Sequence, residues 1–475
     1  MKNLLILFFN ICVVFQLFAQ NHPAITRFVG TEYLRGASVS LMVREVGSGK
    51  AVYSYDADRE VIPASVLKTV TTATAIELLG ADYCYQTHLM YDGTVEDSIL
   101  KGNIHIIGSG DPSLGSEELK NNCYAFINEW VTAIKNAGIK FVTGAVISDA
   151  GIFDTEGVSM KWLREDLGTN YGQGCYGLNV FDNRFALFMN TYFHDSKPVI
   201  DCTQPEMYGM TFRNYLKTGD KDSCYIVGAP YSDERWLYGV VPANRTDYKL
   251  GGDIPDPPLY LAKLLTETLK QQGIIIAQEP TDRRLLAQQG VVYPQEQQRQ
   301  PLAVTTSPPL SQLARITNNV SSNLYADAFV KTLGLRCNEP LSSFGKGVRV
   351  VHDFWQSKGL DTSPLWMSDG SGLAPTDKIT ASLLSKILCL MADNKAFVES
   401  LPVAGEEGTV KSVLKDSSLH GKARLKSGSM SRVRSYAGYV YKNDKTYAIT
   451  VITNNFNCRQ AQIKTEIEQL LLGLF

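Results

Sequence analysis

The sequence predicts an α+β fold in which helices flank an antiparallel sheet and a large, mostly β-rich insertion interrupts the chain. Near the N-terminus, residues 37–46 and 51–55 are apolar, β-rich runs separated by a Gly-Ser-Gly turn. Near the C-terminus, residues 432–441 and 446–453 flank an Asn-Asp turn. Both patterns are typical of hairpins. Hairpins at both ends with helices between them indicate one sheet domain assembled from distant segments.

The helices and strands between the hairpins are predicted from apolar runs and from the proline, glycine and turn residues that end them. Residues 66–79 form a long apolar and threonine-rich run between Pro63 and Gly80, which predicts a buried helix with a proline near its start and a glycine at its end. Short β-rich runs separated by turn residues dominate the middle of the chain. The remaining predictions are strands at 104–107, 141–147 and 224–227, a helix at 259–271 and a terminal helix at 458–472.

Length and composition limit the classes of protein. A chain of 475 residues is too long for one ordinary core, so several domains are expected. With 44% hydrophobic residues, 20% charged residues and a net charge of −2, the chain is typical of a soluble globular protein and shows no basic excess for nucleic acid. The six histidines have no metal-like spacing, so we expect no metal site and no cofactor.

The predicted organisation begins with a signal peptide at residues 1–19. Lys2 precedes an apolar run that is too short for a comfortable membrane span, and cleavage after Ala19 is plausible. We therefore expect an exported, periplasmic protein, with loose membrane association or a retained N-terminal anchor left open. The discontinuous sheet domain is expected at 20–85 and 297–475. The insertion, 86–296, is expected to form two subdomains, the second at roughly 190–256.

Ser65-Val66-Leu67-Lys68 places a serine and a lysine three residues apart, on one face of the predicted helix. A serine hydroxyl is a poor nucleophile until a nearby base takes its proton. A lysine does this when burial or a second cation disfavours its charged form. The alternative interpretation is that Ser65 only caps a helix.

The same S-x-x-K spacing occurs at Ser343–Lys346 and, with identical letters, at Ser412–Lys415. Ser343 precedes two glycines, a poor helical context, and polar residues follow Lys415 so closely that no long buried helix is expected there. Context therefore favours Ser65 as the nucleophile.

Two further motifs follow in a fixed order. Ser321-Ser322-Asn323 precedes an apolar helix, where a hydroxyl and a carboxamide can face a cleft or simply cap the helix. Lys426-Ser427-Gly428-Ser429 indicates an edge strand whose glycine lets a substrate backbone approach and whose Lys426 and Ser427 suit a carboxylate. An ordinary exposed strand is the alternative for this segment. In this order, S-x-x-K, S-x-N and K-S/T-G indicate an acyl-serine active site.

With these motifs, the chain resembles the penicillin-recognising serine enzymes. More closely, it resembles the D-alanyl-D-alanine carboxypeptidase/endopeptidase family, the class C low-molecular-mass penicillin-binding proteins (peptidase S13-like). The large insertion between the first two motifs is a family trait. Further matching segments are Gly108-Ser109-Gly110-Asp111-Pro112-Ser113-Leu114, Asp369-Gly370-Ser371-Gly372-Leu373, Leu401-Pro402-Val403-Ala404-Gly405 with Gly408-Thr409, and Ser435-Tyr436-Ala437-Gly438-Tyr439.

The resemblance implies a penicillin-binding-protein or serine β-lactamase-like transpeptidase domain and a role for each motif residue. Ser65 would attack the carbonyl of the penultimate D-alanine of a peptidoglycan peptide, and Lys68 would receive its proton. The remaining implied roles are proton relay by Ser321, binding of the acyl side's amide by Asn323, binding of the terminal carboxylate by Lys426 and Ser427, and an oxyanion hole from the backbone N–H groups of Ser65 and Ser429.

Three details of the resemblance are less regular. The middle residue of S-x-N is Ser322, where the family commonly has aspartate or asparagine, and the strand has K-S-G in place of K-T-G. An aspartate of the inserted domain can bind the amino group of the peptide's diamino acid in this family. Asp149 is the candidate here, and a turn aspartate is its alternative interpretation.

The expected function is a serine D,D-peptidase that removes terminal D-alanine, with cleavage of cross-links left open, and that β-lactams acylate as covalent inhibitors. A serine β-lactamase-like hydrolase shares the three motifs, although the insertion argues against it. A non-catalytic cell-wall binding protein is the remaining alternative. The sequence leaves oligomeric state, disulfide pairing and the preferred diamino acid undetermined.

Overall fold

The computed structural model describes residues 22–293 and 299–475. The predicted signal peptide lies outside the described residues. By contacts, the chain divides into unit 1, with residues 22–82, 310–322 and 348–475, and unit 2, with residues 83–309 and 323–347. No helix in the described ranges has both the length and the apolar character needed to cross a membrane.

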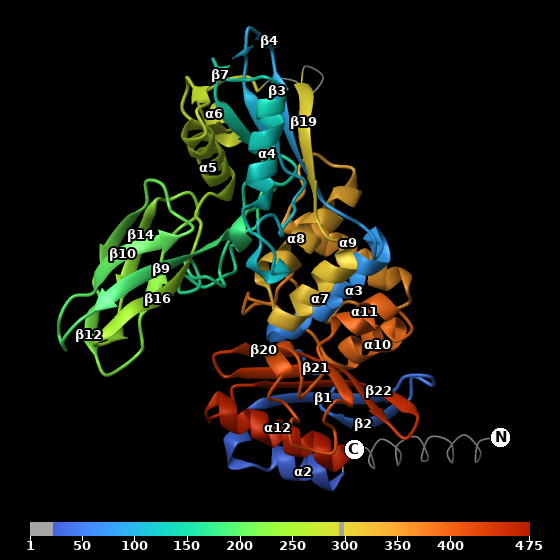
Figure 1. The fold of residues 1–475 in the computed structure, drawn as a ribbon. Helices are drawn as coiled ribbons and strands as arrows, with labels where there is room; N and C mark the ends of the chain where they lie inside the picture. The colour runs from blue at the N-terminus through green and yellow to red at the C-terminus, as the bar shows by residue number, and fades with distance from the viewer. Residues whose placement is uncertain (1–21, 294–298) are drawn as a thin grey trace. The chain divides into compact units, whose positions relative to one another are not determined.

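Unit 1 contains a five-stranded antiparallel sheet in the order β2-β1-β22-β21-β20 (Figure 1). The adjacent inner strands β1 and β22 come from opposite ends of the chain, and each belongs to one of the two predicted hairpins, which are confirmed. The strands are β1 (Ser38–Glu45), β2 (Ala51–Tyr55), β20 (Ala423–Met430), β21 (Val433–Lys442) and β22 (Lys445–Asn454).

Helices cover both faces of this sheet. On one face, the N-terminal helix α2 packs against the terminal helix α12, and their apolar side chains join those of the strands in one buried core (Figure 1). On the other face, α10 contacts β1, β21 and β22. The helices of this unit are α2 (Pro23–Val29), α3 (Lys68–Leu79), α7 (Leu310–Val320), most of α9 (Phe344–Ser357), α10 (Ala381–Met391), α11 (Lys395–Ser400) and α12 (Gln460–Leu474).

Unit 2 contains two sheets around a second core, to which α4 and α5 contribute. The sheet orders are β18-β8-β6-β3-β19 and β17-β7-β5-β4. The elements are β3 (Gln86–Asp92), β4 (Thr94–Glu96), β5 (Ile99–Lys101), β6 (Ile104–Ile107), α4 (Ala125–Asn136), β7 (Phe141–Val142), β8 (Val146–Asp149), α5 (Pro257–Gln271), β17 (Ile275–Ile276), β18 (Thr281–Asp282), α6 (Arg283–Gln288), β19 (Arg299–Thr306) and α8 (Asn323–Gly334).

A further group of strands in unit 2 surrounds its own small apolar core. It has the sheets β10-β9-β16, β11-β14-β13 and β12-β15. These strands are β9 (Arg184–Thr191), β10 (Val199–Gln204), β11 (Thr211–Asn214), β12 (Lys217–Gly219), β13 (Tyr225–Val227), β14 (Glu234–Tyr238), β15 (Val240–Pro242) and β16 (Arg245–Asp253). A sheet domain with a mostly β-rich insertion is the predicted fold class. The exact domain boundaries stay predictions.

Two local predictions are wrong. The run 141–147 is not one strand: it forms β7 and β8, which belong to different sheets. The chain turns at Gly144, where an added Cβ would collide with the Gly102 carbonyl and the Asn103 side chain. The glycines after Ser343 do not prevent a helix, because α9 begins at Phe344 and includes both.

Candidate active site

The backbone at Ser65 is held by two strands of the unit 1 sheet. Ser65 lies in a 3₁₀ turn, η2 (Ala64–Leu67), that leads directly into α3. Ala64 has a φ of 49°, which is uncommon for a residue with a Cβ. Ser435 Oγ of β21 donates a hydrogen bond of 2.6 Å to the Pro63 carbonyl. A Cβ on Gly428 of β20 would lie 3.0 Å from the Ser65 nitrogen, so glycine permits this close approach.

Ser65 and Lys68 form the predicted side-chain pair. The Ser65 Oγ and Lys68 Nζ atoms are 2.9 Å apart. Lys68 is fully buried, whereas Ser65 is partly exposed. Lys68 Nζ also donates to the Ser371 carbonyl over 2.7 Å. The pair therefore joins an accessible hydroxyl to an amine that the protein shields from water.

The other two S-x-x-K segments lack this arrangement. Lys346 Nζ donates to the carbonyls of Pro340 and Leu341, over 2.6 and 2.8 Å, and Ser343 Oγ accepts the backbone N–H of Lys346 as a helix cap. Ser412 and Lys415 are both exposed and lie in turns outside the helices. Geometry thus separates the Ser65 segment from sequences of the same spacing.

A loop built on Asp369 positions the carbonyl that Lys68 contacts. The Asp369 carboxylate accepts hydrogen bonds from the backbone N–H groups of Ser371, Gly372 and Ala374, at 2.9, 2.7 and 2.9 Å. These bonds fix the loop, whose Gly370 carbonyl accepts a further hydrogen bond of 2.7 Å from Thr71 Oγ1 of α3. The D-G-S-G-L segment is therefore a support for the helix that carries Lys68.

Ser321 and Lys426 form a second serine–lysine pair in unit 1. Lys426 Nζ of β20 donates to Ser321 Oγ over 2.9 Å and to the Ser427 carbonyl over 2.7 Å. Ser321 follows α7 and has a φ of 62°, so the chain turns sharply at this residue. The lysine of the third motif thus contacts the serine of the second.

Lys426 has an unusual electrostatic environment. It is fully buried, and this burial, together with the positive charges of Lys68 and Arg434, lowers the pKa of Lys426 well below its usual value. Two lysines and an arginine close enough to repel one another favour an anionic ligand, which would offset the repulsion. Arg434 lies opposite Ser429 on the neighbouring strand β21.

The rest of the third motif lies along β20, the predicted edge strand, which ends the sheet order. Ser427 Oγ donates to Thr409 Oγ1 over 2.7 Å or accepts from it. Ser429 is exposed. An edge strand has backbone groups without a neighbouring strand, so β20 can pair with an extended peptide.

Asn323 and Asp149 belong to unit 2. Asn323 is the first residue of α8, and its Nδ2 donates to the Tyr171 carbonyl over 2.8 Å. Asp149 is a buried residue at the end of β8, and its Oδ1 accepts from the Gly151 N–H at 2.8 Å and from Arg283 at 3.3 Å. These contacts match the turn interpretation of Asp149. The substrate roles of Asn323 and Asp149 stay predictions.

Sequence reasoning assigned no role to several residues that support the site. Asp369 and Thr409 lie in segments that the family resemblance marked, but a motif alone does not show which atoms they contact. Ser435 also begins a segment that the resemblance marked. Arg434 gave no signal, because its proximity to the site depends on the register of β20 and β21. In the described ranges no cluster of three or more potential metal ligands occurs.

Comparisons with known proteins identify the family of the chain. The model of the D-Ala-D-Ala carboxypeptidase 3 (S13) family matches residues 23–472. The D-alanyl-D-alanine carboxypeptidase of Actinomadura sp. (strain R39) is 26% identical over 438 residues, which cover 89% of this chain and 78% of that protein.

Two solved structures share the fold. The crystal structure of penicillin binding protein 4 from Haemophilus influenzae superposes with a TM-score of 0.81 at 20% identity, covering 96% of this chain and 98% of that chain. A penicillin G-acylated predatory endopeptidase from Bdellovibrio bacteriovorus has a TM-score of 0.50 at 16% identity, with 92% and 93% covered. The family match spans nearly the whole described chain, and the chain therefore belongs to the D-Ala-D-Ala carboxypeptidase 3 (S13) family.

Proposed function

We propose that this protein is a serine D,D-peptidase that hydrolyses peptidoglycan stem peptides through an acyl-enzyme on Ser65. The observation that carries the proposal is the 2.9 Å contact between Ser65 Oγ and the fully buried Lys68 Nζ. Family membership and the names of the relatives support D-alanyl-D-alanine as the bond that is cut.

In the first step, Lys68 takes the proton of Ser65, and the Oγ atom bonds to the carbonyl carbon of the penultimate D-alanine. A buried amine beside a second cation favours its uncharged form, which a general base requires. The backbone N–H groups of Ser65 and Ser429 would stabilise the oxyanion. The close approach of β20 to η2 at Gly428 supports this assignment.

In the second step, the bond between the carbonyl carbon and the leaving nitrogen breaks. Ser321, in contact with Lys426, would relay to the leaving nitrogen the proton that Lys68 took from Ser65, so that D-alanine departs as a neutral amine and Ser321 keeps its own proton count. The terminal carboxylate of the substrate would offset the repulsion that lowers the pKa of Lys426 and so favour its charged form, and Lys426 and the Ser427 hydroxyl would then bind this carboxylate. Asn323 would hold the amide on the acyl side. Water then hydrolyses the ester on Ser65 and regenerates the enzyme.

The same nucleophile would open a β-lactam ring and remain acylated. We further propose that the enzyme cleaves cross-links, because an edge strand such as β20 can pair with an extended peptide chain. The named structural relatives include a penicillin-acylated endopeptidase, which supports both extensions. Export to the periplasm, where peptidoglycan is accessible, remains part of the proposal.

A fluorescent penicillin and a peptide ending in D-Ala-D-Ala test the proposal. Wild-type protein should become covalently labelled and should release D-alanine, and Ser65→Ala should abolish both. Ser412→Ala is the matched control, since its segment has the same four letters. It should behave like the wild type.

Two outcomes would contradict the proposal. Labelling that survives in Ser65→Ala and is lost in Ser412→Ala would show that the nucleophile is Ser412. Rapid penicillin turnover without release of D-alanine would instead indicate a β-lactamase.

A further inference from the structure

Four aromatic rings lie on the outer face of the small sheet β11-β14-β13 in unit 2. Exposed fractions are 57% for Tyr215, 52% for Tyr225 and 36% for Trp236, which is high for side chains of this size. These residues and Tyr238 are called the aromatic platform below. A contiguous group of exposed aromatic side chains can mark an interaction site in a soluble protein.

The platform follows from strand alternation. On β14, Leu237 points into the small core while its neighbours Trp236 and Tyr238 point outward. On β13, Ile226 is buried and Tyr225 is exposed. The outer aromatic residues are therefore not part of the small core.

The rings are arranged as a row of nearly parallel planes. Tyr215 stacks with Trp236 at a centroid distance of 6.0 Å and an angle of 9°, and with Tyr238 at 5.5 Å and 10°. Tyr225 stacks with Tyr238 at 5.7 Å and 30°. Each ring is held by its neighbours, so ordering the platform for a ligand costs little side-chain entropy.

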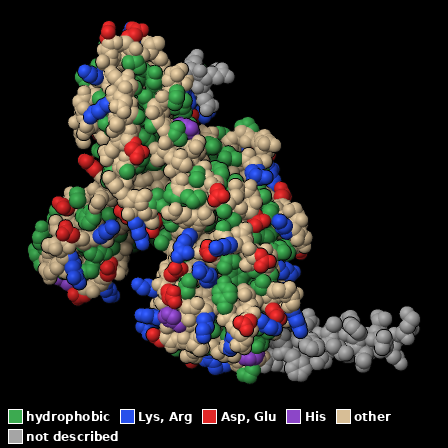
Figure 2. All heavy atoms as spheres, turned by 45° about the vertical axis from the view of Figure 1, so that its right-hand side comes forward, with side chains coloured by type: hydrophobic (Ala, Val, Ile, Leu, Met, Phe, Trp, Pro, Cys, Tyr) green, Lys and Arg blue, Asp and Glu red, His purple; other side chains and the backbone are tan. Residues whose placement is uncertain are grey.

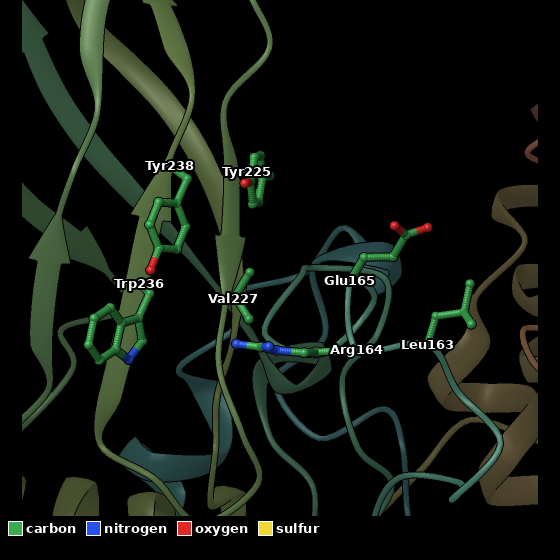
Figure 3. Close-up of a pocket in the computed structure, with 7 residues that line it drawn as sticks. All are labelled: Leu163, Arg164, Glu165, Tyr225, Val227, Trp236 and Tyr238. Carbon is green, nitrogen blue, oxygen red and sulfur yellow. The ribbon is translucent and has the colours of Figure 1, made fainter.

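A cavity of about 670 Å³ adjoins the platform (Figure 3). A loop with Leu163, Arg164 and Glu165 lines its other side, and the Arg164 side chain extends toward the strands that carry Val227 and Trp236. The cavity thus combines aromatic surface with a guanidinium donor and a carboxylate acceptor. None of its lining residues is a candidate catalytic residue.

We propose that the aromatic platform and this loop bind the glycan strand of peptidoglycan. The C–H groups of pyranose rings carry partial positive charge, which the negative faces of aromatic rings attract. Trp236 and Tyr225 are the end rings of the stacked row and each has one face that no other platform ring covers, and both line the cavity. Arg164 can donate to N-acetyl and hydroxyl oxygens, and Glu165 can accept from hydroxyl groups. The choice of this polymer rests on the proposed function, whereas the preference for sugar rings rests on the platform.

Charge favours a sugar over a nucleic acid strand. Single-stranded nucleic acids also stack on aromatic rings but need a positively charged groove. Residues 184–253 contain eight Lys and Arg and nine Asp and Glu. Arg213, beside the platform on β11, is paired with Glu234 at 2.6 Å. The surface in Figure 2 likewise shows acidic and basic side chains interspersed. A polar polymer without phosphates suits a surface on which basic and acidic residues are nearly equal in number.

Binding of peptide-free glycan strands to the Ser65→Ala protein tests the proposal by titration calorimetry. Trp236→Ala should weaken binding roughly tenfold, the loss of one stacking partner, and Trp236→Phe should restore most of it. Tyr192→Ala is the matched control, because Tyr192 is 52% exposed outside the platform and should leave binding unchanged. Circular dichroism verifies that each variant is folded.

Equal binding by Trp236→Ala and the parent protein would overturn the proposal, as would no binding of glycan strands or tighter binding of single-stranded DNA. Release of D-alanine from a short peptide is measured separately with the wild-type protein, which retains Ser65. Since that peptide carries no sugar, failure of the peptidase proposal is distinguishable from failure of the glycan site.

Discussion

Lys68 is the residue on which the proposed chemistry most depends. Replacing it with methionine keeps a buried chain of similar length but removes the base. General acid–base groups contribute roughly 100- to 10,000-fold to rate, so Lys68→Met should slow acylation by fluorescent penicillin by at least about 100-fold. Lys346→Met in the Ser343 segment is the control and should acylate at the wild-type rate. Equal rates for both variants would exclude Lys68 as the base.

Asp377 links the site's supporting loop to pH. Burial and the neighbouring Asp369 carboxylate raise the pKa of Asp377 well above its usual value. The folded state therefore keeps a proton that the unfolded chain loses above about pH 3.8. Because the folded state binds more protons, this carboxyl's contribution to stability is fully present below the unfolded pKa and declines as pH rises toward the folded pKa.

Asp377→Asn should remove that decline. Its amide oxygen can still accept the Ser368 N–H, which lies 2.7 Å from Asp377 Oδ1. Relative to the wild type, the urea midpoint of the variant should therefore rise as the pH increases from about 3.8 toward the raised pKa of Asp377. The exposed Asp361, whose pKa is lowered, is the control, and Asp361→Asn should show no such rise. If the difference in urea midpoint between Asp377→Asn and the wild type did not change with pH, Asp377 would be ionised in the folded state.

Among the elements, β20 lies close to the nucleophile, because its backbone at Gly428 approaches the backbone of Ser65. A Cβ on Gly428 would lie 2.8 Å from the Pro63 carbonyl and 3.0 Å from the Ser65 nitrogen, so Gly428→Ala should push β20 away from η2. Small displacements at a reacting centre can cost roughly 100-fold in rate. Acylation should slow by that order at temperatures where circular dichroism shows that the variant is folded. Gly345→Ala in α9, where a Cβ has space, should leave acylation unchanged. Unchanged acylation in Gly428→Ala would contradict this role of β20.

The elements also show what sequence patterns can predict. The two hairpins, the edge strand β20 and the helix after Ser65 were predictable because each depends on local alternation, turn residues or a glycine stop. The three motifs S-x-x-K, S-x-N and K-S-G could be recognised for the same reason, because each is a short segment with its own local context.

Predictions failed where contacts between distant segments decide the structure. The division of 141–147 depends on Gly144 meeting residues 102 and 103, and the helix at Gly347 depends on close packing with Val330. Arg434 reaches the environment of Lys426 only through strand pairing. No local pattern carries these contacts.

At the scale of the whole molecule, unit 1 is assembled from three segments that include both described ends of the chain. Ser65 comes from the first segment, Ser321 from the second and Lys426 from the third. The sheet joins them, since β1 pairs directly with β22. The stability of the site is therefore linked to elements far from it, including α12.

Ile467 tests this link, because it is fully buried on α12 in the core of unit 1. Ile467→Ala should cost about 2–5 kcal/mol of unfolding free energy. After brief heating, penicillin labelling should be lost at a lower temperature than in the wild type, although the labelling rate at room temperature is unchanged. Thr465→Ala, on the exposed face of α12, should keep the wild-type midpoint. Identical midpoints for the two variants would show that labelling does not depend on the core beneath the sheet.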